Sequence, residues 1–262
     1  MAVNAPFVYN AHIESIASLA RTATDLKTLE TVCENLNVAD EIYLGKVDLW
    51  LAKIALSAVY RTLKKFPAIR SRINYFGTLN GFIEKKDPTF TAVNPTASKM
   101  HLEYFRQATL EVARNCLNSF RANGIGLAFA VGVPPFYMNG IIINGKSLHK
   151  QEIMQNLEYG EKIGHSPKGC KSVKSVIDHE IGHLLDYALD LSNNRQLQAY
   201  INSFSVAEMS KNLSLYSTTG GVISVPEVIA EAYSEYVNNP SPRPIAKTIG
   251  EFIEARYEDR FR

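Results

Sequence analysis

The sequence is poor in cysteine, and its three cysteines lie far apart. Cys33, Cys116 and Cys170 form no CxxC pair, and their number is odd. A disulfide framework needs cysteines in pairs, and a thiolate zinc site needs them close together. The sequence therefore supports neither kind of site. Cys33 and Cys116 fall on helical patterns, and we expect both to be ordinary core residues.

A strong charge of one sign is also missing. The 28 Lys and Arg residues and the 26 Asp and Glu residues give a formal net charge of +2. Proteins that bind nucleic acid carry a concentrated basic patch, whereas the short lysine clusters of this chain are typical of solvated loops. We therefore expect no nucleic-acid partner.

Long apolar runs are absent as well. None reaches the length of about 18 residues that a membrane helix needs. The N-terminal stretch also lacks the basic segment, followed by an apolar one, that marks a secretory signal. We expect no membrane partner and a cytoplasmic location.

The apolar pattern that is present predicts an α+β fold with a small sheet. Apolar residues recur at helical spacing over most of the chain, and three short β-favouring segments bounded by Gly and Pro lie between them. An order with a few strands early in the chain and only helices later is typical of this fold class. The helices are predicted at residues 11–36, 39–66, 98–120, 150–162, 196–204, 226–237 and 244–261, and the strands at 73–76, 127–131 and 138–144. A further helix, which carries residues 176–186, is predicted to begin near Ser172 or Ser175, either of which is a good N-cap.

One predicted helix carries polar residues that a core helix does not need. The stretch VIDHEIGHLLD, residues 176–186, contains His179, Glu180 and His183 in an apolar context. The two histidines are four apart (183 − 179 = 4), so they lie one turn apart on one helix face, where their rings can converge on one ion. Glu180 points to the flank, within reach of a water on that ion. This HExxH pattern is typical of a catalytic zinc site.

The third ligand of such a site must be a carboxylate, because no histidine follows His183. The segment VPEVIAEAYSEYV, residues 225–237, spaces Glu227, Glu231 and Glu235 four apart on one predicted helix face. A solvated stripe is the alternative, but the apolar neighbours favour a ligand. These residues alone leave both Glu227 and Glu231 open as the ligand, while Glu235 is expected at the surface.

The two helix motifs together resemble a known family. VIDHEIGHLLDYA, followed by LSLYSTTGGVISVPEVIAEAY, is similar to the zincins related to anthrax lethal factor, with the pattern HExGHxxD, then Tyr, then ExxAE. Tailed-phage head-morphogenesis proteins carry similar domains. The resemblance covers residues 38–237 in order, but only the two helix motifs are specific.

The resemblance implies a role for each polar residue. Glu227, 44 residues after His183 (227 − 183 = 44), would be the third zinc ligand, and Glu231 would accept the other N–H of a ligand histidine. Tyr216 would support the oxyanion, although its gap to Glu227 is longer than in the family, which leaves a packed tyrosine as the alternative. Asp186 is expected to orient local structure. His165, in a loop that the family shares, is expected to be structural.

The resemblance also implies an architecture and an activity. We expect an N-terminal helical extension, residues 1–37, and a zincin-like domain, residues 38–262. That domain would have a lobe with a small mixed sheet and the active helix (38–186) and a helical lobe (187–262). The activity is that of a gluzincin-type metallopeptidase, a hydrolase with one Zn²⁺ per chain. Its zinc-bound water, activated by Glu180, would attack the peptide bond.

The partner would be a peptide or protein substrate. Such substrates often bind as an added strand, and residues 139–146, from Asn139 to Lys146, are a candidate edge strand, with a core strand as the alternative. Two other functions stay open: a phage structural or assembly protein that uses the domain as a scaffold, and an effector toxin. The location would then be virion-associated rather than cytoplasmic, or outside the producing cell.

Overall fold

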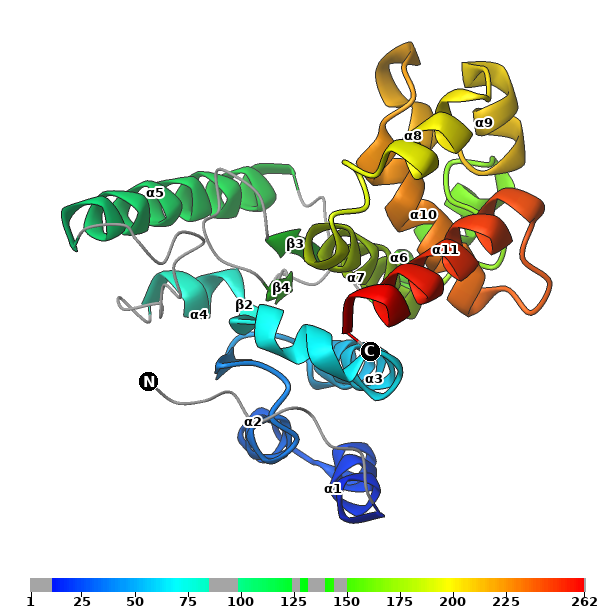
Figure 1. Ribbon diagram of the computed structural model, residues 1–262. Helices are drawn as coiled ribbons and strands as arrows, with labels where there is room; N and C mark the ends of the chain where they lie inside the picture. Colours follow the sequence, from blue (N-terminus) through cyan, green and yellow to red (C-terminus); the bar gives the residue numbers. More distant parts are fainter. Residues whose placement is uncertain (1–10, 85–98, 124–127, 132–139, 144–149, 262) are drawn as a thin grey trace. The chain divides into compact units, whose positions relative to one another are not determined.

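The fold is described from a computed structural model of the chain (Figure 1). It describes residues 11–84, 99–123, 128–131, 140–143 and 150–261. The chain divides into two compact units, Met1–Leu148 and His149–Arg262. The first unit contains a small mixed sheet and the second contains helices, so the protein is of the α+β class, as the sequence predicts.

The units do not divide where the sequence predicted. The N-terminal helices belong to the first unit, because Lys53 Nζ of α3 donates to the Arg21 carbonyl of α1 and because Leu29 and Cys33 of α2 are fully buried. The predicted lobe boundary at residues 186 and 187 falls inside one helix of the second unit, α7 (Val173–Leu189). The helix that carries the HExxH motif is therefore part of the second, helical unit and not of the unit with the sheet.

The first unit is built on a four-stranded mixed sheet. The strand order is β1-β2-β4-β3, with β1 and β4 parallel to β2 and with β3 antiparallel to β4. All four residues of β2 and of β4 are buried, as is usual for central strands. The strands are β1 (Glu41–Tyr43), β2 (Tyr75–Thr78), β3 (Ala128–Val131) and β4 (Gly140–Ile143).

The prediction of an edge strand at residues 139–146 is therefore wrong. Of residues 139–146, the structure describes Gly140–Ile143, and this strand pairs with β2 on one side and with β3 on the other. The remaining residues of that segment lie outside the described ones. The three isoleucines at 141–143 are buried completely, because both faces of a central strand are covered. The core-strand alternative is the one that the structure supports.

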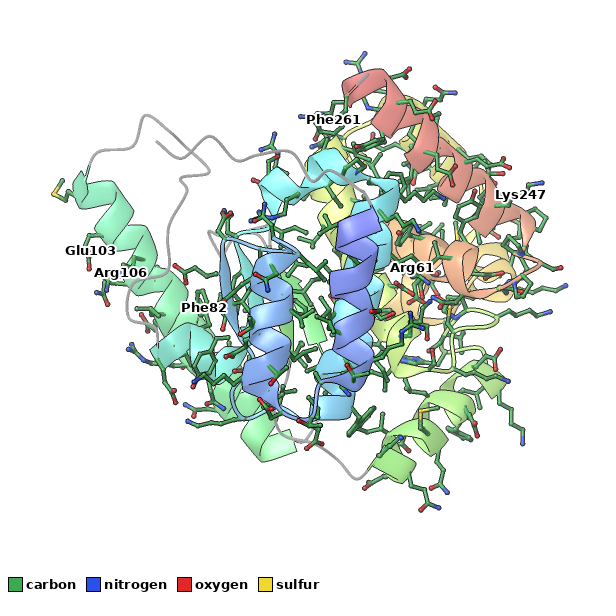
Figure 2. The ribbon with its side chains drawn as sticks, turned by 90° about the horizontal axis from the view of Figure 1, so that it is seen from below. Arg61, Phe82, Glu103, Arg106, Lys247 and Phe261 are labelled. Carbon is green, nitrogen blue, oxygen red and sulfur yellow. The ribbon has the colours of Figure 1, made fainter. Side chains whose placement is uncertain are left out.

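Helices make up most of the rest of the first unit. The predicted helix 11–36 is two helices, because Asp25 caps the second by accepting from Thr28 N at 2.8 Å. The predicted helix 39–66 starts only at Leu49, and β1 occupies its first part. Figure 2 shows Phe82 among these elements, where it packs edge-on against Tyr75. The helices are α1 (Ala11–Thr22), α2 (Leu26–Asn35), α3 (Leu49–Lys65), η1 (Pro67–Arg72), α4 (Leu79–Glu84) and α5 (Lys99–Asn123).

The described part of the second unit is helical throughout. Its last helix, α11, is exposed along the face that carries Lys247, which Figure 2 shows at the outside. None of the described helices combines the length and the apolar character that crossing a membrane requires. The elements are α6 (Lys150–Lys162), α7, α8 (Arg195–Asn202), α9 (Val206–Asn212), η2 (Tyr216–Gly221), α10 (Val225–Asn238) and α11 (Pro244–Phe261).

Helices α7 and α10 pack closely at the centre of this unit. Helix α7 begins with a capping box between Ser172 and Ser175, so Ser172 is its N-cap. Gly182 allows the close approach, because a Cβ atom there would lie 2.6 Å from Ala230 Cα of α10. The apolar residues of α7 that the sequence placed in the core, including Ile177 and Ile181, are buried. This contact brings the polar residues of the two helices together.

Candidate metal centre

Helix α7 presents both histidines of the HExxH motif on one side. The Nε2 atoms of His179 and His183 are 3.2 Å apart, and the rings meet edge to face with centroids at 4.8 Å. Both side chains are largely but not completely buried. The spacing of one helical turn, predicted from the sequence, is therefore realised with both ring nitrogens facing the same point.

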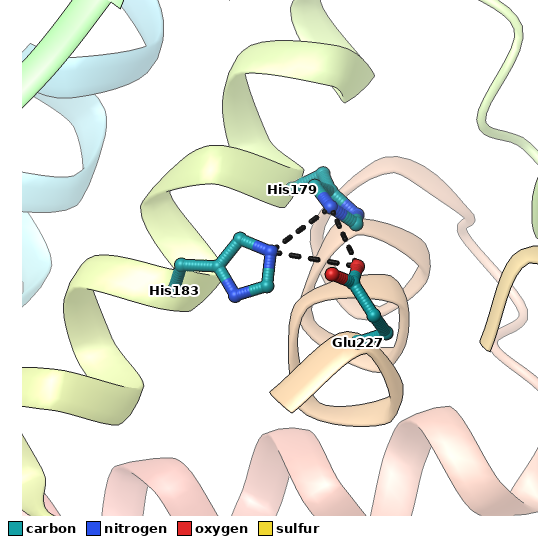
Figure 3. A group of neighbouring side chains, drawn as sticks. All are labelled: His179, His183 and Glu227. Carbon is teal, nitrogen blue, oxygen red and sulfur yellow. Dashed lines mark hydrogen bonds and ion pairs between the residues drawn. The ribbon is translucent and has the colours of Figure 1, made fainter. Parts of the chain in front are cut away.

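Helix α10 adds a carboxylate from its first turn. Glu227 Oε2 lies 3.3 Å from His179 Nε2 and 3.5 Å from His183 Nε2 (Figure 3). Pro226 also stands in this first turn, where its missing N–H breaks no hydrogen bond of the helix. His179, His183 and Glu227 form a group that could hold a metal ion.

The distances between the three donor atoms fit a tetrahedral ion. Ligands at about 2.0–2.1 Å from a tetrahedral metal are separated from one another by about 3.3–3.4 Å. The observed separations are 3.2, 3.3 and 3.5 Å. Glu227 Oε2 is also buried, and although it faces two imidazoles it makes no well-formed hydrogen bond. A cation between the three atoms would satisfy that oxygen.

Glu231, one turn further along α10, meets the other side of His179. Its Oε1 atom is 2.7 Å from His179 Nδ1, and the side chain is buried. The structure thus separates two roles that the sequence left open, with Glu227 on the Nε2 side and Glu231 on the Nδ1 side. A carboxylate at Nδ1 keeps the proton there and directs the lone pair of Nε2 towards the other donors.

The charges of the centre shift its protonation equilibria. Burial by itself lowers the pKa of His179, but the carboxylates of Glu227 and Glu231 outweigh burial and hold it well above its usual value. Burial raises the pKa of Glu227, but contacts with His179 and His183 dominate and bring it down to about 2. Ion pairs between the imidazoles of α7 and the carboxylates of α10 therefore link the two helices.

Tyr216 lies beside the centre. Its ring is 5.6 Å from that of His179 and 5.4 Å from that of His165, and its backbone N–H donates to the His165 carbonyl at 3.2 Å. Burial, followed by the carboxylates of Glu227 and Glu180, raises the pKa of Tyr216 to about 12. Its hydroxyl thus keeps its proton at neutral pH and can donate a hydrogen bond. His165 is not among the three donors and packs against Tyr216.

Glu180 is half-buried on α7 next to His179. After larger causes, the charge of Glu180 contributes to the raised pKa of His179 and of Tyr216. Its position directly after His179 on α7 is the one that the HExxH motif assigns to the general base, and that role stays a prediction.

Asp186 lies at the other end of α7 and does not join the donors. Its carboxylate accepts from the backbone N–H and the hydroxyl of Ser192, the former at 2.7 Å, and burial raises its pKa. It thereby ties the C-terminal end of α7 to the turn that follows. This is the local structural role that the resemblance implied.

The sequence analysis expected Glu235 at the surface, and this prediction is wrong because its side chain is fully buried. It forms an ion pair with Arg243, whose Nη2 atom lies 2.6 Å from Glu235 Oε2. The same guanidinium donates to the carbonyls of Lys211 and Leu213, just before the segment that carries Tyr216. The sequence contained no spacing signal for this contact, since the partners lie on different elements.

Comparisons with protein-family models, with curated proteins and with solved structures find no match for this chain. What the centre does must therefore be inferred from its own donors and neighbours. The centre offers two imidazoles and one carboxylate as donors, with the carboxylate of Glu180 next to His179 in the chain.

Proposed function

We propose that this chain is a zinc-dependent endopeptidase of gluzincin type, built on a zincin-like arrangement of α7 and α10. The observation that carries the proposal is the near-equilateral set of three donor atoms, His179 Nε2, His183 Nε2 and Glu227 Oε2, at 3.2–3.5 Å from one another. The resemblance of the two helix motifs to the lethal factor-like zincins points to the same activity.

The donor set favours zinc over other common ions. Mg²⁺ and Ca²⁺ take oxygen ligands almost exclusively, whereas two imidazoles with one carboxylate are typical of catalytic zinc. His179, His183 and Glu227 would hold the zinc and leave room for a water or substrate oxygen as a further ligand. The zinc would supply Lewis acidity, which lowers the pKa of a water towards neutral and polarises the scissile carbonyl.

The surrounding side chains supply the proton transfers. Glu180 takes a proton from the attacking water while the water oxygen forms a bond with the carbonyl carbon. Glu180 then passes this proton to the amine nitrogen as the C–N bond breaks. Tyr216, protonated at neutral pH, donates a hydrogen bond to the oxygen on which negative charge develops. Glu231 keeps the proton of His179 on Nδ1 throughout.

The alternative functions make less use of these residues. A scaffold for phage assembly needs no general base in the motif, whereas Glu180 directly follows His179 in HExxH, and its charge contributes to the raised pKa of His179 and of Tyr216. An effector toxin would use the same chemistry on a particular host protein, so it differs in substrate and not in mechanism.

Metal analysis and peptide cleavage together test the proposal. We expect one zinc per chain, cleavage of members of a peptide library, loss of cleavage with a chelator and its return with added zinc. Glu180→Gln should keep the metal and lower kcat by about 10²–10⁴-fold. The control Glu251→Gln, at an exposed position of α11, should change neither. A Glu180→Gln variant as active as the unchanged protein would exclude this mechanism.

A further inference from the structure

Four large apolar side chains on two neighbouring segments, one of which carries Tyr216, are exposed to solvent. Tyr159 is 62% exposed, Ile163 and Leu215 are each 48% exposed, and Tyr216 is 38% exposed. Single exposed apolar residues are normal on a protein surface. A group of them that lies together next to a candidate active site usually marks a binding surface.

Backbone contacts join the two segments that carry these side chains. Ile163 N–H donates to the Tyr159 carbonyl at 3.0 Å, so the two residues lie one turn apart on the same side of the end of α6. The chain then turns at Gly164, whose φ of 75° suits glycine. The Gly164 carbonyl accepts from Leu215 N–H at 2.8 Å, and the His165 carbonyl accepts from Tyr216 N–H at 3.2 Å. We call Tyr159, Ile163, Leu215 and Tyr216 the apolar strip.

The strip begins at the metal centre. Tyr216, at one end, has its ring 5.6 Å from that of His179. Leu215 precedes Tyr216 in the chain, and its N–H bonds to the Gly164 carbonyl, directly after the end of α6 that carries Ile163 and Tyr159. A peptide whose carbonyl lies at the three donor atoms would pass Tyr216, and the two segments next to it offer these exposed apolar side chains. A second copy of this chain seated on the strip would cover Tyr216 and close the centre, so the substrate is the occupant that fits.

We propose that the apolar strip binds the substrate on one side of the scissile bond and selects peptides with large apolar residues there. This inference rests on the proposed function and names the substrate class of the same centre. An extended peptide presents alternate side chains to one face, so every second residue on that side would contact the strip. Small or charged residues at those positions would leave the strip exposed and bind more weakly.

Two surface variants test the strip, with binding and cleavage measured separately. Binding of a labelled peptide with Leu at alternate positions on either side of its centre is measured on the zinc-loaded Glu180→Gln protein. The same peptide with Ala at those positions is the comparison. Ile163→Ser and Leu215→Ser should each weaken binding of the Leu peptide by roughly 10-fold and leave the Ala peptide unchanged. Val206→Ser, at a 37% exposed apolar residue on α9, is the matched control.

Cleavage by the unchanged catalytic protein gives the second measurement. The two variants should raise KM for Leu peptides by the same factor with kcat little changed, because neither residue touches the reacting atoms. An equal preference for Leu over Ala in the unchanged protein and both variants would overturn the inference. So would variants that alter only the oligomeric state in sedimentation. If peptides bind with the expected preference but none is cleaved, the proposed function fails and the strip stands. The milder Ile163→Ala is used if a serine variant fails to fold.

Discussion

The Nδ1 atom of His179, on α7, lies 2.7 Å from Oε1 of Glu231, on α10. Glu231 is buried, so this contact is shielded from solvent and fixes the orientation of the imidazole. The opposite ring nitrogen faces His183 and Glu227 at 3.2 and 3.3 Å. His179 is therefore a donor through Nε2 and is held through Nδ1 by Glu231, which is not a donor. Metal binding should depend on this contact.

Glu231→Gln should weaken zinc binding while the three donors stay in place. Removing the charge that holds the proton on Nδ1 makes Nε2 a poorer ligand, and changes of this kind cost about 10–100-fold in metal affinity. Competition with a chromophoric chelator measures the affinity. Glu251→Gln, with its partner Lys247 at the surface, is the control and should bind zinc as the unchanged protein does. Equal affinity in both variants would argue against the role assigned to Glu231.

Zinc binding should release protons near neutral pH. The carboxylates of Glu227 and Glu231 outweigh burial and raise the pKa of His179 in the metal-free protein, so its imidazole carries a proton that the metal must displace. The apparent affinity should therefore rise as pH increases from 6 to 8. Calorimetry in two buffers of different ionisation enthalpy at pH 7 measures the release, and a binding enthalpy that is identical in both would contradict it.

Tyr216→Phe should lower kcat without changing zinc affinity. Loss of one hydrogen-bond donor to a developing oxyanion costs about 10²–10³-fold in kcat, whereas loss of a hydroxyl from a merely packed ring costs the reaction little. Steady-state kinetics with one peptide substrate decides between these two roles. Tyr104→Phe removes a hydroxyl from an exposed tyrosine of α5, outside the second unit, and serves as the control. Equal rates for the two variants would favour the packed tyrosine.

Gly182→Ala should destabilise the second unit. The added Cβ would lie 2.6 Å from Ala230 Cα and 3.2 Å from its carbonyl oxygen, so backbone has to move. We expect a loss of about 1–3 kcal/mol in the free energy of unfolding, measured with urea, together with weaker zinc binding as α7 and α10 separate. Gly160→Ala, in α6, meets only Ser166 Oγ at 3.4 Å and should be neutral or slightly stabilising. Similar behaviour of both variants would show that the helix contact tolerates the methyl group.

Arg243→Gln should destabilise the protein by about 3–5 kcal/mol, because it leaves the fully buried Glu235 without its cationic partner. Replacing both residues by apolar ones, Arg243→Met with Glu235→Leu, should recover much of this loss. Lys247→Gln breaks an exposed pair and should change stability by less than about 1 kcal/mol. Urea unfolding measures all three. A double variant no more stable than Arg243→Gln would show that the carbonyl contacts of Arg243 matter more than its ion pair.

Local rules account for the parts of the centre that were predictable. Two histidines four residues apart share a helix face in any fold, because the α-helix turns once every 3.6 residues. Pro226 marks the first turn of α10, which begins at Val225, and the cap of α7 at Ser172 is one of the two serines, with Ser175, that the sequence offered. The sequence alone therefore determined which two imidazoles converge.

Long-range contacts decided the rest. Helical spacing cannot tell Glu227 from Glu231, because the one that meets Nε2 depends on where α10 crosses α7, and Gly182 and Ala230 set that crossing. The burial of Glu235 depends on Arg243 from another segment, and the central place of β4 depends on its pairing with β3. Only the tertiary structure could settle these points, because each is decided by contacts between residues far apart in the chain, whose energies no local pattern records.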